Sequence, residues 1–151
     1  MVSYLVYATL RDPTDWEGWI ANIHRVALIY HIWQYMDPSL KEQPEEPDPD
    51  KIEEPHPSQI REGAETPGDL TDGEYRTFQW KVAKYDRDYE RARRARYYLA
   101  EMMIQIDRTV DSSWRYLINN CLTPWSMLSR LQGPLKPRGA GWKEDIGRRY
   151  Y

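Results

Sequence analysis

The chain has 151 residues, a formal net charge of −3 and an unusual aromatic composition, with one Phe against 7 Trp and 12 Tyr. This length predicts a single domain, residues 1–151, whose core is filled largely by indole and phenol rings. The only cysteine, Cys121, excludes an internal disulfide framework and a cysteine-rich metal site, so we expect a reducing, cytoplasmic location.

The first residues, MVSYLVYATLRDP, are too short and too often interrupted by polar residues to predict a signal peptide. No apolar run in the chain approaches the roughly 18 residues that a membrane-spanning helix needs. We therefore expect no membrane partner.

Residues 15–36 form the first predicted helix. Thr14 and Glu17 have the spacing of a capping box, in which a hydroxyl and a carboxylate each satisfy a free amide. Apolar residues then recur every three or four positions, which indicates one buried stripe. Tryptophans at this spacing could line a ligand pocket, but they are more often core. The predicted core residues are Trp16, Trp19, Ile20, Ile23, Ala27 and Trp33.

Residues 37–70 form an acidic insert that is rich in proline. Between residues 37 and 69 there are 11 acidic and 3 basic residues, a net charge of −8, whereas the rest of the chain carries +5. The same segment holds 7 of the 11 prolines, which remove backbone donors and disfavour helix and sheet. We expect an extended loop or strap. It is either a solvated spacer or a segment that docks on the chain's own basic surface and shields it from nucleic acid.

A second capping box, Thr71 with Glu74, precedes a long predicted helix at about residues 72–111. At about 1.5 Å per residue, some 40 residues would measure about 60 Å, so the helix either kinks or projects one end toward a partner. Arg96 falls within its apolar stripe and should reach either water or an acidic partner, for which the insert is a source. The predicted core residues are Tyr75, Phe78, Val82, Leu99, Met103, Ile106 and Val110.

The middle of this helix is densely charged. Asp88 and Glu90 have the spacing to pair with Arg91 and Arg94, which favours a solvated, self-paired face. The alternative is a nucleic-acid contact, since arginines neutralise phosphates. Its candidate residues are Arg87, Arg91, Arg93, Arg94, Lys143, Arg148 and Arg149.

Shorter helices are predicted in the remainder. One of the serines at 112–113 should cap or bend the chain, and Thr123 should cap a helix that begins at Pro124. The glycine and proline at 133–134 should end that helix. A last, basic and aromatic helix is expected from about residue 141.

These landmarks follow one another in a particular order. A W-x-x-W-I opening leads to A-x-x-x-x-I-W-x-Y-x-D-P, the Pro-rich acidic insert and an L-T-x-x-E-Y helix start. A heptad-like helix ending in I-x-x-[ST]-V and a T-P-x-x-x-L-x-x-L turn follow. The series resembles the capsid region of Gag proteins from copia-type retrotransposons, the fungal ones in particular. The matching residues are Trp16, Trp19, Ile20, Ala27, Ile32, Trp33, Tyr35, Asp37, Pro38, Leu70, Thr71, Glu74, Tyr75, Ile106, Thr109, Val110, Thr123, Pro124, Leu128 and Leu131.

The resemblance implies an all-α bundle, similar to a capsid N-terminal domain, that assembles with copies of itself into a virus-like shell around RNA. The contacts between copies would be weak and multivalent. The chain lacks the C-x-x-C-x-x-x-x-H-x-x-x-x-C zinc knuckle and the D-[ST]-G protease triplet of a full Gag polyprotein. These departures argue against direct, specific RNA binding and point to a fragment or a domesticated derivative.

Catalysis finds little support in the sequence, and we expect no enzyme, cofactor, metal or small-molecule substrate. His24, His31 and His56 lack the mutual spacing of metal ligands, and no glycine-framed nucleophile turn or phosphate loop is present. Three classes of function remain. A structural self-assembly domain is preferred, a nucleic-acid-binding module with a basic helix face comes second, and a helical adaptor with an aromatic groove comes third.

Overall fold

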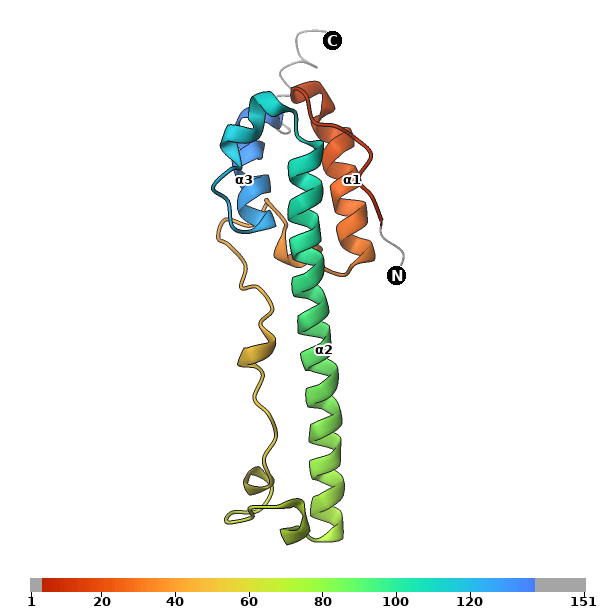
Figure 1. The fold of residues 1–151 in the computed structure, drawn as a ribbon, viewed down its shortest axis with the longest axis vertical. Helices are drawn as coiled ribbons and strands as arrows, with labels where there is room; N and C mark the ends of the chain where they lie inside the picture. The colour runs from red at the N-terminus through yellow and green to blue at the C-terminus, as the bar shows by residue number, and fades with distance from the viewer. Residues whose placement is uncertain (1–3, 138–151) are drawn as a thin grey trace, which may run out of the picture. The chain divides into compact units, whose positions relative to one another are not determined.

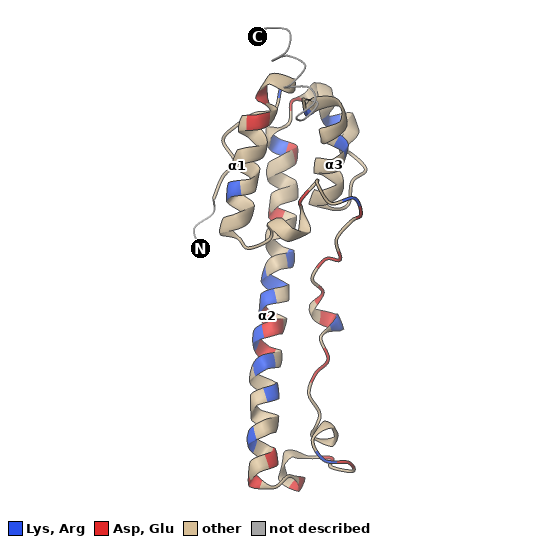
Figure 2. Cartoon of the chain, turned by 180° about the vertical axis from the view of Figure 1, so that it is seen from behind, with Lys and Arg blue, Asp and Glu red and all other residues tan. Residues whose placement is uncertain are grey.

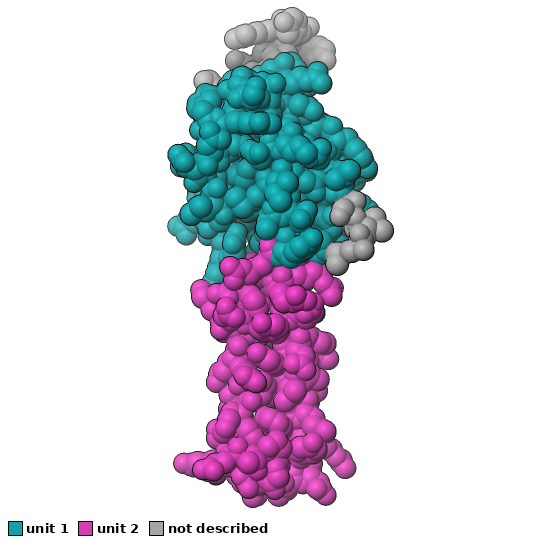
Figure 3. All heavy atoms as spheres, viewed as in Figure 1, with its two compact units in different colours: residues 1–46, 97–151 teal, residues 47–96 magenta. Residues whose placement is uncertain are grey.

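The computed structural model describes residues 4–137, and the chain divides into two compact units (Figure 3). Unit 1 comprises Met1–Glu46 and Tyr97–Tyr151, and unit 2 comprises Pro47–Arg96. Within the described residues there are helices, turns and one isolated β-bridge, between Leu10 and Val110, but no strand. The all-α class is therefore confirmed. Because helix α2 contributes residues to both units, the single domain stays a prediction.

Helix α1 (Trp16–Ile29) follows the 3-10 turn η1 (Pro13–Asp15) in unit 1 (Figure 1). The predicted capping box of Thr14 with Glu17 is wrong. The Asp12 carboxylate caps η1 instead, since it accepts hydrogen bonds from the Thr14 amide at 2.8 Å and from the Thr14 hydroxyl. Pro13, at the first position of the turn, starts the helical conformation before the predicted cap.

The predicted end of the first helix near residue 36 is also wrong, because α1 ends at Ile29. His31 has a left-handed backbone, with φ of 60°. The Ile32 amide donates a hydrogen bond of 2.9 Å back to the Ala27 carbonyl, as in a Schellman motif. Ile32 is fully buried, as expected for a motif that a hydrophobic contact frequently accompanies. In the next 3-10 turn, η2 (Trp33–Tyr35), the side chains therefore have other directions than they would have in a continuation of α1.

Helix α2 (Asp72–Thr109) begins as predicted. The Thr71 amide donates to Glu74 Oε1 at 2.9 Å, and the Glu74 amide donates to Thr71 Oγ1 at 3.3 Å, so the capping box is confirmed. The helix ends two residues before the expected 111. The Thr109 carbonyl accepts a hydrogen bond of 2.8 Å from the Leu10 amide, so the N-terminal segment replaces the next helical turn.

The buried face of α2 differs in two positions from the predicted one. Ala95 rather than Arg96 is buried between Ala92 and Leu99, and Met102 rather than Met103 is fully buried. The predicted and the observed series of buried residues both have steps of three and four, so apolar spacing alone could not show which of the two is buried. Arg96 lies outside the buried face, with its side chain 53% exposed.

The last described helix, α3 (Pro124–Leu135), follows the 3-10 turn η6 (Ser112–Leu117). Asp111, rather than one of the serines, caps η6, since its carboxylate accepts from the Ser113 amide at 3.1 Å. The predicted Thr123 cap is confirmed, with Thr123 Oγ1 accepting from the Ser126 amide at 3.1 Å. The helix does not end at 133–134. It continues to Leu135, whose side chain is fully buried, and Pro134 lies inside its last turn. The helix expected from residue 141 lies outside the described residues.

The core of unit 1 is built around two tryptophans of α1. The Trp16 and Trp19 rings lie 5.7 Å apart, and Trp19 Nε1 donates to the buried Thr109 hydroxyl at 2.9 Å. Ile20, Trp33 and Met103 are only partly buried. The predicted core residues that are buried are Trp16, Trp19, Ile23, Ala27, Leu99, Ile106 and Val110.

Unit 2 has no comparable core. Of the residues predicted to be core here, Phe78 and Val82 are partly buried, whereas Tyr75 is 42% exposed and its assignment to the core is wrong. The reason is the composition of the unit. The part of α2 that belongs to it is accompanied by an extended segment without an α-helix, so no second helix covers these side chains.

Candidate interaction surface

An extended strap, residues 47–71, accompanies α2 within unit 2 (Figure 1). It contains three 3-10 turns, η3 (Pro49–Lys51), η4 (Pro57–Gln59) and η5 (Pro67–Asp69), and each begins at a proline. Proline suits this position, because its φ is already helical. An amide N–H in the first turn has no carbonyl partner, so the absence of this group in proline costs no hydrogen bond. The strap is therefore a defined structure. Pro49, Pro57 and Ala64 are its buried residues.

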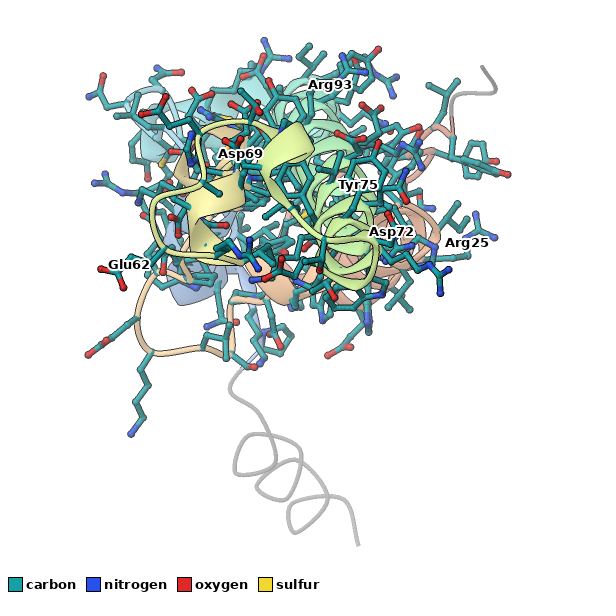
Figure 4. The ribbon with its side chains drawn as sticks, turned by 90° about the horizontal axis from the view of Figure 1, so that it is seen from below. Arg25, Glu62, Asp69, Asp72, Tyr75 and Arg93 are labelled. Carbon is teal, nitrogen blue, oxygen red and sulfur yellow. The ribbon has the colours of Figure 1, made fainter. Side chains whose placement is uncertain are left out.

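Ion pairs join the strap to α2. Asp48 lies 3.4 Å from Arg96 Nη1, and Arg61 Nε lies 3.3 Å from Glu74 Oε1. The expectation that Arg96 meets an acidic partner from the insert is thus confirmed, although Arg96 does so from outside the buried face. Hydrogen bonds from Thr71 and the nearby Arg61 guanidinium lower the pKa of Glu74, despite some desolvation. In Figure 4 Glu62 projects away from α2, so this part of the strap faces solvent.

Two open grooves lie between strap and helix. The larger, of about 650 Å³, is lined by Ile52, Glu53, Pro55 and Gln59 of the strap and by Trp80, Lys81, Lys84, Tyr85 and Asp88 of α2. The smaller, of about 400 Å³, has Pro67 at one edge and an α2 floor of Tyr75, Phe78, Gln79, Val82, Ala83 and Asp86. Desolvation, followed by the charge of Glu54, raises the pKa of Tyr85 in the larger groove. Both grooves combine aromatic rings with charged rims, as protein-binding grooves do.

Aromatic residues follow one another along the unit 2 part of α2. We name Tyr75, Phe78, Val82, Tyr85 and Tyr89 the aromatic stripe. The Tyr85 and Tyr89 rings lie 5.8 Å apart, and apart from Tyr75 all members are half-buried. Trp80 lies off the stripe and is 59% exposed.

Acidic residues lie among the basic residues along α2 (Figure 2), and several of the basic side chains pair with them. Arg93 makes two hydrogen bonds to Glu90, of 2.9 and 3.1 Å, and Arg94 lies 3.9 Å from the same carboxylate. This pairing lowers the pKa of Glu90. Asp88 pairs with Lys84 at 3.0 Å, not with Arg91 as predicted. Of the predicted nucleic-acid contacts, Arg87, Arg91, Arg93 and Arg94 are exposed, whereas Lys143, Arg148 and Arg149 lie outside the described residues.

The histidines have local structural roles. His24 stacks on Trp33 with the ring centroids 4.1 Å apart, and His56 Nδ1 caps η4 by accepting from the Ser58 amide at 3.2 Å. Between residues 4 and 137, no three His, Cys, Asp or Glu side chains come together as a metal site. In the same range no helix has both the length and the apolar character to span a membrane.

Comparison with protein-family models, with curated proteins and with solved structures finds no match for this chain. Its function is therefore argued from its own surfaces. The sequence interpretation missed Gln79, Trp80, Lys81 and Asp86 as groove residues. The alternation of charge beside the aromatic stripe was the signal that could have indicated Lys81 and Asp86.

Proposed function

We propose that this protein is a structural self-assembly domain, the capsid-like part of a retrotransposon Gag protein or of a domesticated derivative, which forms a cytoplasmic shell around RNA. The order of its sequence motifs supports the family, and its helical character is compatible with it. The observation that carries self-association is the exposure of large apolar side chains in both units. In unit 1 the exposed fractions are 75% for Tyr7, 66% for Tyr116 and 86% for Leu122. In unit 2 Trp80 is 59% exposed.

Such side chains gain free energy when another chain covers them, roughly in proportion to the apolar area removed from water. A capsid needs many contacts of this kind, each weak, because multivalency supplies the total affinity. We rank assembly ahead of catalysis because the grooves described above are open and carry no cluster of positioned acid, base and nucleophile.

The test uses light scattering and negative-stain electron microscopy of the full chain across protein and salt concentration. Oligomers or shells should appear as concentration rises, and a double substitution of Tyr116→Ser and Leu122→Ser should raise the concentration needed. The matched control replaces the exposed neighbours Asn119 and Asn120 by Ser and should change nothing. A strict monomer under all conditions would overturn the proposal.

RNA contact through the α2 arginines is the second candidate, favoured by the exposure of Arg87 and Arg91 on one face. The sharing of Glu90 by Arg93 and Arg94 weakens it, because the carboxylate offsets their charge. Fluorescence titration with RNA should separate the two candidates. Replacing Arg87 and Arg91 by Gln should lower affinity and reduce the salt slope by up to about 2, if these residues neutralise phosphates.

A further inference from the structure

The aromatic stripe of α2 has the spacing of a coiled coil. Ala92 and Arg96 continue the stripe, and from residue 75 to residue 96 the steps alternate strictly between three and four. These seven residues therefore occupy the a and d positions of three heptads and form one seam. The a positions are Tyr75, Val82, Tyr89 and Arg96, and the d positions are Phe78, Tyr85 and Ala92. A helix with this pattern normally packs against a second helix along the same seam.

Unit 2 supplies no second helix for this seam. The strap contributes only Pro67 to the groove above Tyr75, Phe78 and Val82, and this groove remains open over about 400 Å³. Tyr75 keeps 42% of its surface exposed. Within unit 2 the seam is thus covered in part, by a segment that lacks the shape of a helix.

The ion pairs of the strap described above hold it to α2 only weakly. They involve Arg61 and Arg96, whose side chains are 50% and 53% exposed. Exposed pairs of this kind contribute little to stability, because water and salt screen them. The strap can therefore yield the d and g side of the seam to a stronger competitor.

The charges beside the seam identify that competitor. Lys81 and Asp88 occupy g positions, and Asp86 and Arg93 occupy e positions. In a parallel, in-register pair of helices, each g residue faces the e residue five positions later on the other helix. Lys81 then faces Asp86 of the other copy and Asp88 faces its Arg93, so both contacts join opposite charges, and symmetry doubles each of them.

We propose that residues 75–96 of α2 pair with the same residues of a second copy as a parallel, two-stranded coiled coil, with the strap as the intramolecular substitute in the monomer. This inference rests on the proposed self-assembly function and names one surface that performs it. Asp88 and Arg93 keep their neighbours Lys84 and Glu90 in the monomer, and in the dimer the four side chains form a shared network.

Sedimentation velocity of the full chain tests the pairing through charge reversal. Lys81→Glu should weaken dimerisation by about tenfold, because two attractive contacts become repulsive. Adding Asp86→Lys to Lys81→Glu should restore it. Arg87→Glu, the same charge change at the outward f position, is the matched control and should leave dimerisation unchanged, with circular dichroism verifying the helix content of every variant.

The outcomes separate this inference from the proposed function. Restoration of Lys81→Glu by Asp88→Lys instead of Asp86→Lys would show an antiparallel pair and overturn the arrangement. Oligomers that ignore all these substitutions would overturn the coiled coil and leave self-assembly standing. A chain that is monomeric throughout would overturn both. Asp48→Asn, which removes one anchor of the strap, should shift the equilibrium toward the dimer, and an unchanged equilibrium would exclude the strap as its competitor.

Discussion

Trp19 is the residue on which unit 1 depends most visibly. Its side chain is fully buried, it lies next to Trp16, and its indole N–H donates to Thr109. A buried tryptophan both fills space and satisfies its own donor here, so its loss leaves a cavity and an unpaired hydroxyl acceptor.

We therefore expect Trp19→Ala to lower the free energy of unfolding by about 3–5 kcal/mol. Trp33→Ala should cost clearly less, because Trp33 is only partly buried and stacks on His24 at the edge of the unit. Urea unfolding followed by circular dichroism measures both. Equal losses for the two variants would contradict this ranking.

Single residues also mark where sequence interpretation reached its limit. Periodicity found Trp16, Trp19 and Ile106, since large apolar residues at helical spacing have few alternatives to burial. It could not find Gln105, which is 4% exposed. Its side chain accepts from the Val6 amide at 2.6 Å and donates to the Tyr4 carbonyl at 2.8 Å. It thus satisfies backbone groups of an N-terminal segment that belongs to no described strand. Such a role depends on a contact distant in sequence.

At the scale of elements, the end of α1 is decided by backbone conformation. His31 adopts a left-handed φ that a residue with a Cβ reaches only at a cost, whereas glycine reaches it freely. Apolar spacing continues past this point, which is why the sequence predicted a longer helix.

His31→Gly should consequently raise the free energy of unfolding by roughly 0.5–1 kcal/mol, the steric relief being offset in part by the greater freedom of glycine in the unfolded chain. Thermal unfolding measures the change. As a control, Glu17→Gly, at an exposed position inside α1, should destabilise the protein instead. A lower melting temperature for His31→Gly would show that the imidazole contributes more than the strain costs.

The start of α2 should respond to acid. The pKa of Glu74 is lowered chiefly by its hydrogen bond from the Thr71 amide. A carboxyl group with a lower pKa in the folded than in the unfolded state stabilises the fold above its unfolded pKa, and this contribution is lost as pH falls through the folded value. The capping box was predictable because all its members lie within four residues.

Amide chemical shifts of Thr71 and Glu74 should therefore change together as pH falls below about 4.5, the ordinary range of a glutamate. Glu74→Gln keeps an acceptor oxygen but cannot titrate, so its amide shifts should stay flat over the same range. A Thr71 shift that follows pH equally in both proteins would assign the effect to another group.

At the scale of the whole molecule, the sequence divided the chain by charge and the structure divides it by packing. The acidic insert was visible because proline and carboxylate composition is a property of a segment, independent of its neighbours. Its ion pairs with Arg96 and Glu74 of α2, the two grooves and the partial cover of the aromatic stripe depend on how the segment lies against α2. Composition does not contain that information. Tyr75, Phe78 and Val82 of the aromatic stripe were predicted from their spacing, but the interpretation as buried core was wrong for Tyr75.

Helix α2 finally experiences two environments along one uninterrupted backbone. Its residues 99–109 belong to the tryptophan-lined core of unit 1, while its residues 75–91 are accompanied by the strap within unit 2. Deuterium should therefore enter the two stretches at very different speeds, fast near Tyr75 and slow near Ile106, since exchange reports the free energy of local opening. Mass spectrometry of exchanged peptides would measure this difference in exchange rate. A second molecule bound to residues 75–91 would slow exchange there and so reduce the difference.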